Sequence, residues 1–220
     1  MSVSLVPASL KVPLADLVPL AGHFVHPSTM HGQGHVARVM VHAFRLLRAT
    51  GHHDETTRLW ASVFLHDLAR THDGRCHVHG GNAWKRLETE EWLQQRLALA
   101  GITVEEHAVI ATAVTMHSKS EELEQTDPHW RLTALLKDAD ALDRVRIRDL
   151  DPRYLRFKES RGMVTFAEEL FTRTDGVIST GPSHFEQLLA VAEGIGGMDA
   201  KQAAFRHAML NGNVSSPSGL

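Results

Sequence analysis

The sequence has little of several features that define common classes of protein. It contains 220 residues and a single cysteine, Cys76, which excludes an internal disulfide framework and fits a reducing compartment. Its longest apolar runs, such as LWASVFL, are too short to cross a bilayer. The first residues, MSVSLVPASLKVPLADL, lack a charged stretch followed by a long apolar core. We therefore expect no signal peptide, no membrane partner and a cytoplasmic location.

The chain also lacks an excess of positive charge. Its formal net charge is −3, so no overall positive field points to nucleic acid as a partner. Strand-like alternation, internal repeats and Gly/Ser linkers are missing as well. A hydrophobic content of 43% and a charged content of 22% are ordinary for a globular protein, and the length suits one domain.

Helical periodicity runs through most of the sequence. Helices are predicted over about 35–49, 54–69, 81–88, 90–100, 104–117, 129–146, 164–174 and 185–195. Gly51 is expected to end the first, and Asp54 and Thr103 to cap two others. The pattern predicts a single all-α domain over 1–210 with a disordered tail over 211–220.

Six side chains in five short segments could bind metal. They are His35, His66, Asp67, His79, His117 and Asp140. Imidazole and carboxylate are ligands for Mn, Fe, Co, Ni and Zn. Asp67 follows an apolar run and Asp140 borders an apolar helix face, and a buried carboxylate needs a compensating partner. A cation would supply that partner, although a hydrogen-bonded His66-Asp67 pair at a helix end is an alternative.

Spacing leaves other positions open. His31 and His42 are alternatives to His35 as a ligand, and His72 and His77 are alternatives to His79. Cys76 is either an accidental metal contact or a spectator thiol. Asp143 is predicted to orient a ligand histidine or to pair with Arg146. Asp138 is predicted to face solvent.

Three motifs, HGQGHVARV, SVFLHDLAR and LLKDADALDR, resemble the HD-domain superfamily of metal-dependent phosphohydrolases, whose pattern is H…HD…D. The resemblance covers about residues 28–148 and leaves a C-terminal extension over about 149–210. It implies an HD-type helical bundle with additional C-terminal helices. Leu-Ala-Arg follows His66-Asp67 where the cyclic-di-nucleotide phosphodiesterases have Ile-Gly-Lys, so that branch is not assigned.

The same resemblance implies a set of ligand residues for one or two divalent ions (Mn, Fe, Co, Ni, Mg or Zn). By it, His35, His66, Asp67 and Asp140 hold one ion, and His79 and His117 complete a second, with Asp67 bridging.

The implied reaction is hydrolysis of a phosphate mono- or diester, of a nucleotide or another small molecule, by a metal-activated water. The catalytic residues would be His66, Asp67 and Asp140, and the phosphate would meet Arg38, Lys119 and Arg144. The basic run from Arg144 to Lys158 contributes to the same role or is a solvated face.

Two alternatives remain. Some HD-type proteins with the same six ligands are di-iron oxygenases that cleave C–C or C–P bonds with O2. A non-catalytic metal- or ligand-binding regulatory protein is the other, which an intact ligand set argues against. The Leu-rich helix EEWLQQRLALA forms part of the core or a homo-oligomer face, so the oligomeric state stays open.

Overall fold

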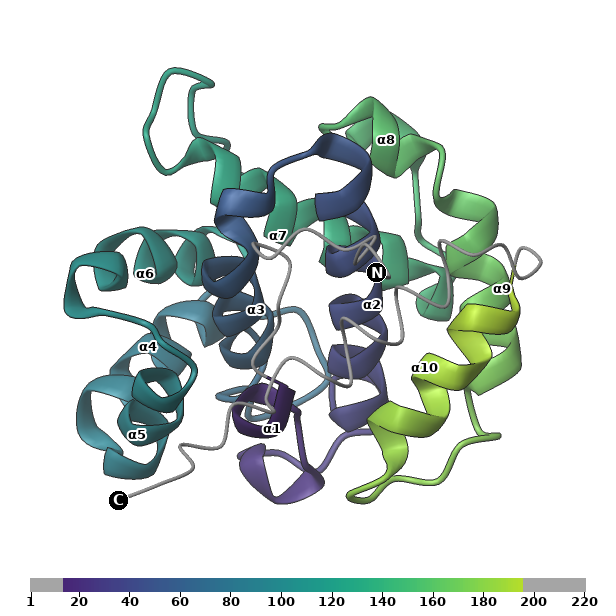
Figure 1. Ribbon diagram of the computed structural model, residues 1–220, viewed down its shortest axis with the longest axis horizontal. Helices are drawn as coiled ribbons and strands as arrows, with labels where there is room; N and C mark the ends of the chain where they lie inside the picture. Colours follow the sequence, from purple (N-terminus) through teal and green to yellow (C-terminus); the bar gives the residue numbers. More distant parts are fainter. Residues whose placement is uncertain (1–13, 196–220) are drawn as a thin grey trace, which may run out of the picture.

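The computed structural model describes residues 14–195, and over that range the chain is all-α, as the sequence predicts (Figure 1). No strand occurs among these residues. The predicted tail over 211–220 and His207 lie outside the described range.

Four helices form the centre of the molecule. They are α2 (Gln33–Thr50), α3 (Thr56–Leu65), α6 (His107–Met116) and α7 (Trp130–Leu142). Helix α2 packs against both α3 and α7, and α6 closes the group by packing against the same two helices. Figure 1 shows α2 and α3 standing side by side in the middle of the molecule. The apolar face of α2 and nearly all of α3 are buried in the core between them.

The remaining helices cover this centre on two sides. On one side lie α1 (Leu14–Leu17), α4 (His79–Thr89) and α5 (Glu91–Leu99); on the other lie α8 (Lys158–Arg161), α9 (Val164–Thr174) and α10 (His184–Gly194). Helix α4 packs on α6, and α10 packs on α2 and α9. Short 3₁₀ helices connect them: η2 (Ala21–His23), η3 (His53–Glu55), η4 (Val104–Glu106), η5 (Asp143–Ile147) and η6 (Pro152–Tyr154).

Several helix ends differ from the predicted ones. Helix α2 ends at Gly51, whose φ of 76° is left-handed, as expected of a C-terminal glycine. Helix α3 is shorter than predicted, because the residues around Asp54 form η3 and no side chain caps α3. The turn 66–69 then follows α3, so the His66-Asp67 pair lies just beyond the helix. Helix α4 begins at His79, which is therefore a helical residue and not part of a loop.

The start of α4 lies very close to the end of α6. A Cβ atom on Gly80 would lie 2.0 Å from the carbonyl oxygen of Val114 and 3.1 Å from the ring of His117. Only glycine fits such an approach without movement of the backbone. The absence of a side chain at Gly80 therefore allows His79, at the start of α4, to meet His117, at the end of α6.

Within residues 14–195, no single helix is long and apolar enough to cross a membrane. Among these residues, only the two segments Glu91–Leu99 and Val104–Met116 taken together reach the length and apolar content of a membrane span, and a bend of 106° separates them.

The close approach at Gly80 predicts a strong effect of one methyl group. Gly80→Ala should lower the free energy of unfolding by about 1–3 kcal/mol or more, because overpacking must push α4 from α6. Gly81→Ala is the matched control, since its Cβ would meet only Thr115 Cγ2, at 4.0 Å. It should be neutral or stabilising by up to about 1 kcal/mol through helix propensity. Denaturant unfolding of both variants measures the difference, and equal stability would contradict the assigned contact.

Candidate metal centre

The structure brings all six predicted metal-binding side chains together at one place. His35 lies in the first turn of α2, His66 and Asp67 in the turn after α3, His79 at the start of α4, His117 directly after α6, and Asp140 in the last turn of α7. The bundle therefore collects these residues at the ends of five helices, which is why distant segments of the sequence can form one site.

The deeper part of the centre surrounds one oxygen of Asp67. His35 Nε2 lies 3.2 Å from His66 Nε2, 3.3 Å from Asp67 Oδ2 and 3.3 Å from Asp140 Oδ1. His66 Nε2 lies 3.6 Å from the same Asp67 oxygen. Both rings are fully buried, so this group of donors forms the inner wall of the site.

The outer part surrounds the other oxygen of Asp67. His79 Nε2 lies 3.1 Å from Asp67 Oδ1 and 2.8 Å from His117 Nε2. The Arg70 guanidinium also donates to Asp67 Oδ1, over 2.8 Å. One oxygen of this buried carboxylate thus faces His35 and His66, and the other faces His79, whose ring meets His117.

The second nitrogen of each ring is already engaged. The Nδ1 acceptors are Asp143 Oδ2 for His35 (2.7 Å), Val63 O for His66 (2.7 Å), Cys76 O for His79 (3.0 Å) and Val114 O for His117 (2.5 Å). Three of the four acceptors are carbonyls three residues earlier in the chain. An acceptor at Nδ1 requires the N–H there, so in a neutral ring the lone pair lies on Nε2.

These lone pairs point at one another. Two neutral imidazoles cannot hydrogen-bond through facing lone pairs, so the close Nε2 contacts of His35 with His66 and of His79 with His117 favour a cation shared by each pair of rings. A proton or a metal ion can be that cation. The donor set of four imidazoles and two carboxylates is typical for divalent transition metals, and the hydrogen bonds to Nδ1 resemble the supporting contacts of metal-bound histidines. The residues present therefore fit a metal ion.

The pKa values follow from the same arrangement. Burial lowers the pKa of His35, but hydrogen bonds with Asp140, Asp143 and Asp67 outweigh burial and raise it to about 9. Burial, together with the nearby His66 and His79, lowers the pKa of His117 to about 3. Burial raises the pKa of Asp67 and Asp140, but the surrounding histidines outweigh it and hold both below the usual range. The carboxylates are thus charged and ready to bind a cation.

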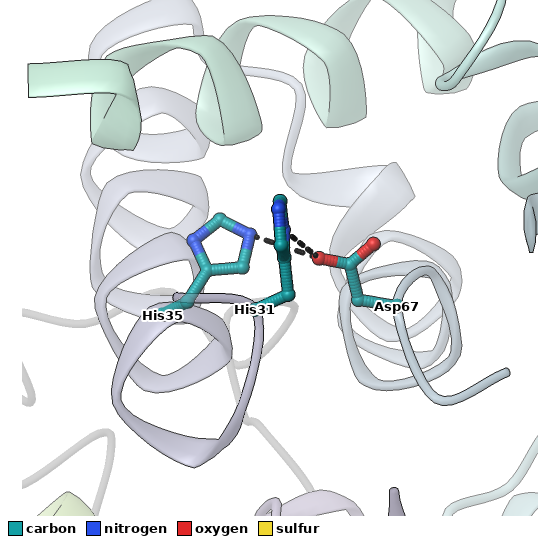
Figure 2. Close-up of side chains that lie close together, drawn as sticks. All are labelled: His31, His35 and Asp67. Carbon is teal, nitrogen blue, oxygen red and sulfur yellow. Dashed lines mark hydrogen bonds and ion pairs between the residues drawn. The ribbon is translucent and has the colours of Figure 1, made fainter. Parts of the chain in front are cut away.

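His31 belongs to the cluster, although the sequence left it as a rival of His35. Figure 2 shows His31 and His35 directed at one oxygen of Asp67, and the His31 contact (Nδ1 to Oδ2) is 3.0 Å. His31 precedes α2, in a turn where its backbone N–H donates to Ser28 Oγ over 2.7 Å. Helical spacing does not describe His31, because it lies before the first residue of α2. The other rival, His42, is a core residue against the ring of Phe166.

Asp143 has the predicted orienting position. It accepts from His35 Nδ1 and, over 2.6 Å, from Nε of Arg38, and it lies 3.7 Å from Arg146. Arg38 is buried behind His35 and does not line the cavity described below, so the structure does not give it the predicted contact with substrate. Its ion pair with Asp143 instead holds the carboxylate that aims His35.

The prediction for Asp138 is wrong. This side chain is fully buried, and it accepts hydrogen bonds from the backbone N–H groups of Arg156 and Phe157 and from Ser160 Oγ, the last over 2.6 Å. The chain after Pro152 folds back over α7 and covers the face that the helix alone would leave in water. Asp138 therefore anchors the C-terminal segment beside the site.

A cavity of about 550 Å³ opens onto the centre. Asp67, His79, His117 and Asp140 line it, whereas His35 and His66 lie behind them. The predicted substrate residues Lys119 and Arg144 line it as well, together with Arg146. The other residues of the basic run do not line this cavity. Arg153 and Lys158 are exposed, and Arg156 pairs with Asp138 and Glu122. Arg148 is also absent from the cavity wall. The cavity gives a small molecule access to one side of the metal-binding group.

Comparisons with protein-family models, with curated proteins and with solved structures find no match to this chain. The assignment of the centre therefore rests on the donor atoms and their geometry.

Removal of Asp67 should abolish metal binding, because its two oxygens serve both histidine pairs. Asp67→Ala, measured by metal content per chain after dialysis, should retain under a tenth of the wild-type metal. Single alanine changes at His66 and Asp140 should have a similar effect, and a milder loss at His79 or His117 would indicate one essential ion. Asp54→Ala removes an exposed carboxylate and is the control. Full metal content in a folded Asp67→Ala protein would refute the site.

Metal affinity should rise with pH. The raised pKa of His35, about 9, means that a metal ion must displace a proton from this ring at neutral pH. Each displaced proton strengthens binding by about tenfold per pH unit. Titration calorimetry between pH 6.5 and 8.5, in buffers with different ionisation enthalpies, measures both the affinity and the protons released. A pH-independent affinity with no proton release would contradict this electrostatic picture.

Proposed function

We propose that the chain is a metal-dependent phosphohydrolase of the HD type, which hydrolyses a phosphate ester of a nucleotide or another small molecule. One observation carries the proposal: His35 and His66 face one oxygen of Asp67, and His79, paired with His117, faces the other, at the end of an open cavity with a positive wall. The order of these residues along the chain matches the HD pattern.

The residues divide into three tasks. His35, His66 and Asp140 would hold one ion against Asp67 Oδ2, and His79 and His117 would hold a second against Oδ1. A bound divalent ion supplies Lewis acidity toward a phosphoryl oxygen and toward water. Asp143 and Arg38 keep the ring of His35 in place, so they are positioning residues.

The charge of the cavity wall supports an anionic substrate. Its cations are Arg70, Arg75, Lys119, Arg144 and Arg146, and its carboxylates apart from Asp67 and Asp140 are Asp73 and Asp149. Five cations against four carboxylates, two of which belong to the proposed metal site, is a positive balance in a chain whose net charge is −3. Positive side chains beside a reacting phosphate stabilise the charge that develops there. Lys119 and Arg144 line the same cavity as Asp140 and are the proposed contacts for that phosphate.

The positive charge of the cavity wall also helps to distinguish the phosphohydrolase from the two alternative functions. The ligand set alone fits a di-iron oxygenase equally well. A wall rich in guanidinium groups is suited to phosphate or phosphonate oxygens, so it weighs against an oxygenase that cleaves the C–C bond of an uncharged substrate. A purely regulatory protein would have no need of a carboxylate shared between two histidine pairs at the end of an open cavity.

Phosphate release from a panel of nucleotides and small phosphate esters tests the proposal, with Mn, Co, Ni, Mg or Zn added. Release should require metal and should fall at least about a hundredfold in Asp67→Ala, since the shared ligand is lost. Asp54→Ala should behave as wild type. A folded, metal-loaded protein that releases no phosphate with any metal would overturn the proposal, and dependence of turnover on O2 would then identify the oxygenase.

A further inference from the structure

The five cations of the cavity wall fall into two groups. Three are engaged with carboxylates: Arg70 donates to Asp67 over 2.8 Å, Arg144 pairs with Asp149, and Arg146 lies 3.7 Å from Asp143. Arg75 and Lys119 have no carboxylate partner among the described residues. A cation that lines a cavity without a partner is available to a ligand, whereas a paired one must first give up its carboxylate.

The two unpaired cations lie on loops that are fastened together. His77 Nδ1 donates to the backbone oxygen of Ser118 over 3.1 Å, and Ser118 Oγ donates to the backbone oxygen of His77 over 3.2 Å. These bonds join the loop that precedes α4 to the loop that follows α6, so Arg75 and Lys119 stand on one rim. The fastening reduces the entropy that the loops would lose on binding a ligand.

The rim borders two hollows. Arg75 and Lys119 line the main cavity and also a neighbouring hollow of about 630 Å³, which has Ser120 and Glu121 in its wall. His117, two residues before Lys119, lies in the metal-binding group. A ligand that extends from the metal centre into this neighbouring hollow lies beside both cations.

We propose that this rim binds a second anionic group of the substrate, so that the natural substrate carries at least two phosphates, as a phosphoanhydride or a bisphosphate does. The inference rests on the proposed function for the reacting phosphate, which lies at the metal centre. Arg75 offers a planar fork of N–H donors to the second phosphate, and Lys119 offers a point charge between the two. A monoester of a neutral alcohol uses the metal centre with Lys119 and Arg144 and makes no use of Arg75.

Binding of inorganic anions to the full-length protein, as purified, tests the rim; because tripolyphosphate is itself a phosphoanhydride, its integrity is checked after each titration. Titration calorimetry should show tripolyphosphate binding at least about tenfold tighter than orthophosphate, and Arg75→Ala should weaken tripolyphosphate by about tenfold while orthophosphate is unchanged. Lys119→Ala should weaken tripolyphosphate at least as much. Lys85→Ala is the control, because Lys85 is exposed on α4 and does not line the cavity. Metal content is measured after each titration, since tripolyphosphate chelates metals.

Kinetics give a second readout. Arg75→Ala should raise KM for a nucleoside diphosphate or triphosphate about tenfold and leave KM for 4-nitrophenyl phosphate unchanged. Equal affinity of the wild-type protein for tripolyphosphate and orthophosphate would overturn the proposal, as would unchanged tripolyphosphate binding in both rim variants. Tight, Arg75-dependent binding without phosphate release from any ester would leave the rim standing and refute the proposed function alone.

Discussion

The structure depends on the charge of one buried carboxylate. Asp67 is almost completely enclosed, yet its oxygens meet five nitrogen-bearing side chains: His31, His35, His66, His79 and Arg70. A single guanidinium gives only partial compensation, so the rest of the site is arranged to place positive charge between the rings and the carboxylate. The ends of α2, α3 and α4 converge because each of them brings one of these rings to Asp67, and the end of α6 brings His117 against His79. The same need explains why Gly80 has no side chain.

Much of this site could be predicted from the sequence, because the position of each ligand residue depends on the short segment that contains it. His66, Asp67 and His117 directly follow apolar runs, and such runs become buried helices whose ends lie in the interior. A polar side chain at that position must find a partner inside the protein. Helix type and approximate position follow from periodicity, so the all-α fold was predictable as well.

The parts that could not be predicted depend on contacts between distant segments. Asp138 looks solvent-facing on its own helix, and only the return of the chain at residues 156–160 buries it. His31 joins the cluster because the turn before α2 leaves the helical path, which no helix-face argument describes. Arg38 has the spacing of a substrate ligand but turns toward Asp143, and one helix gives no information about that choice.

The histidines are aimed by their own neighbourhoods. His66, His79 and His117 each donate from Nδ1 to the carbonyl three residues before them, so each ring is oriented by the backbone of its own four-residue segment at a helix end. Such a unit is autonomous: it needs a helix end and one backbone oxygen, and no particular side chain around it. These three rings can therefore keep their orientation while the surrounding side chains change, provided that the helix ends still meet. The arrangement of their nitrogen atoms thus depends on the backbone far more than on the side chains packed around it.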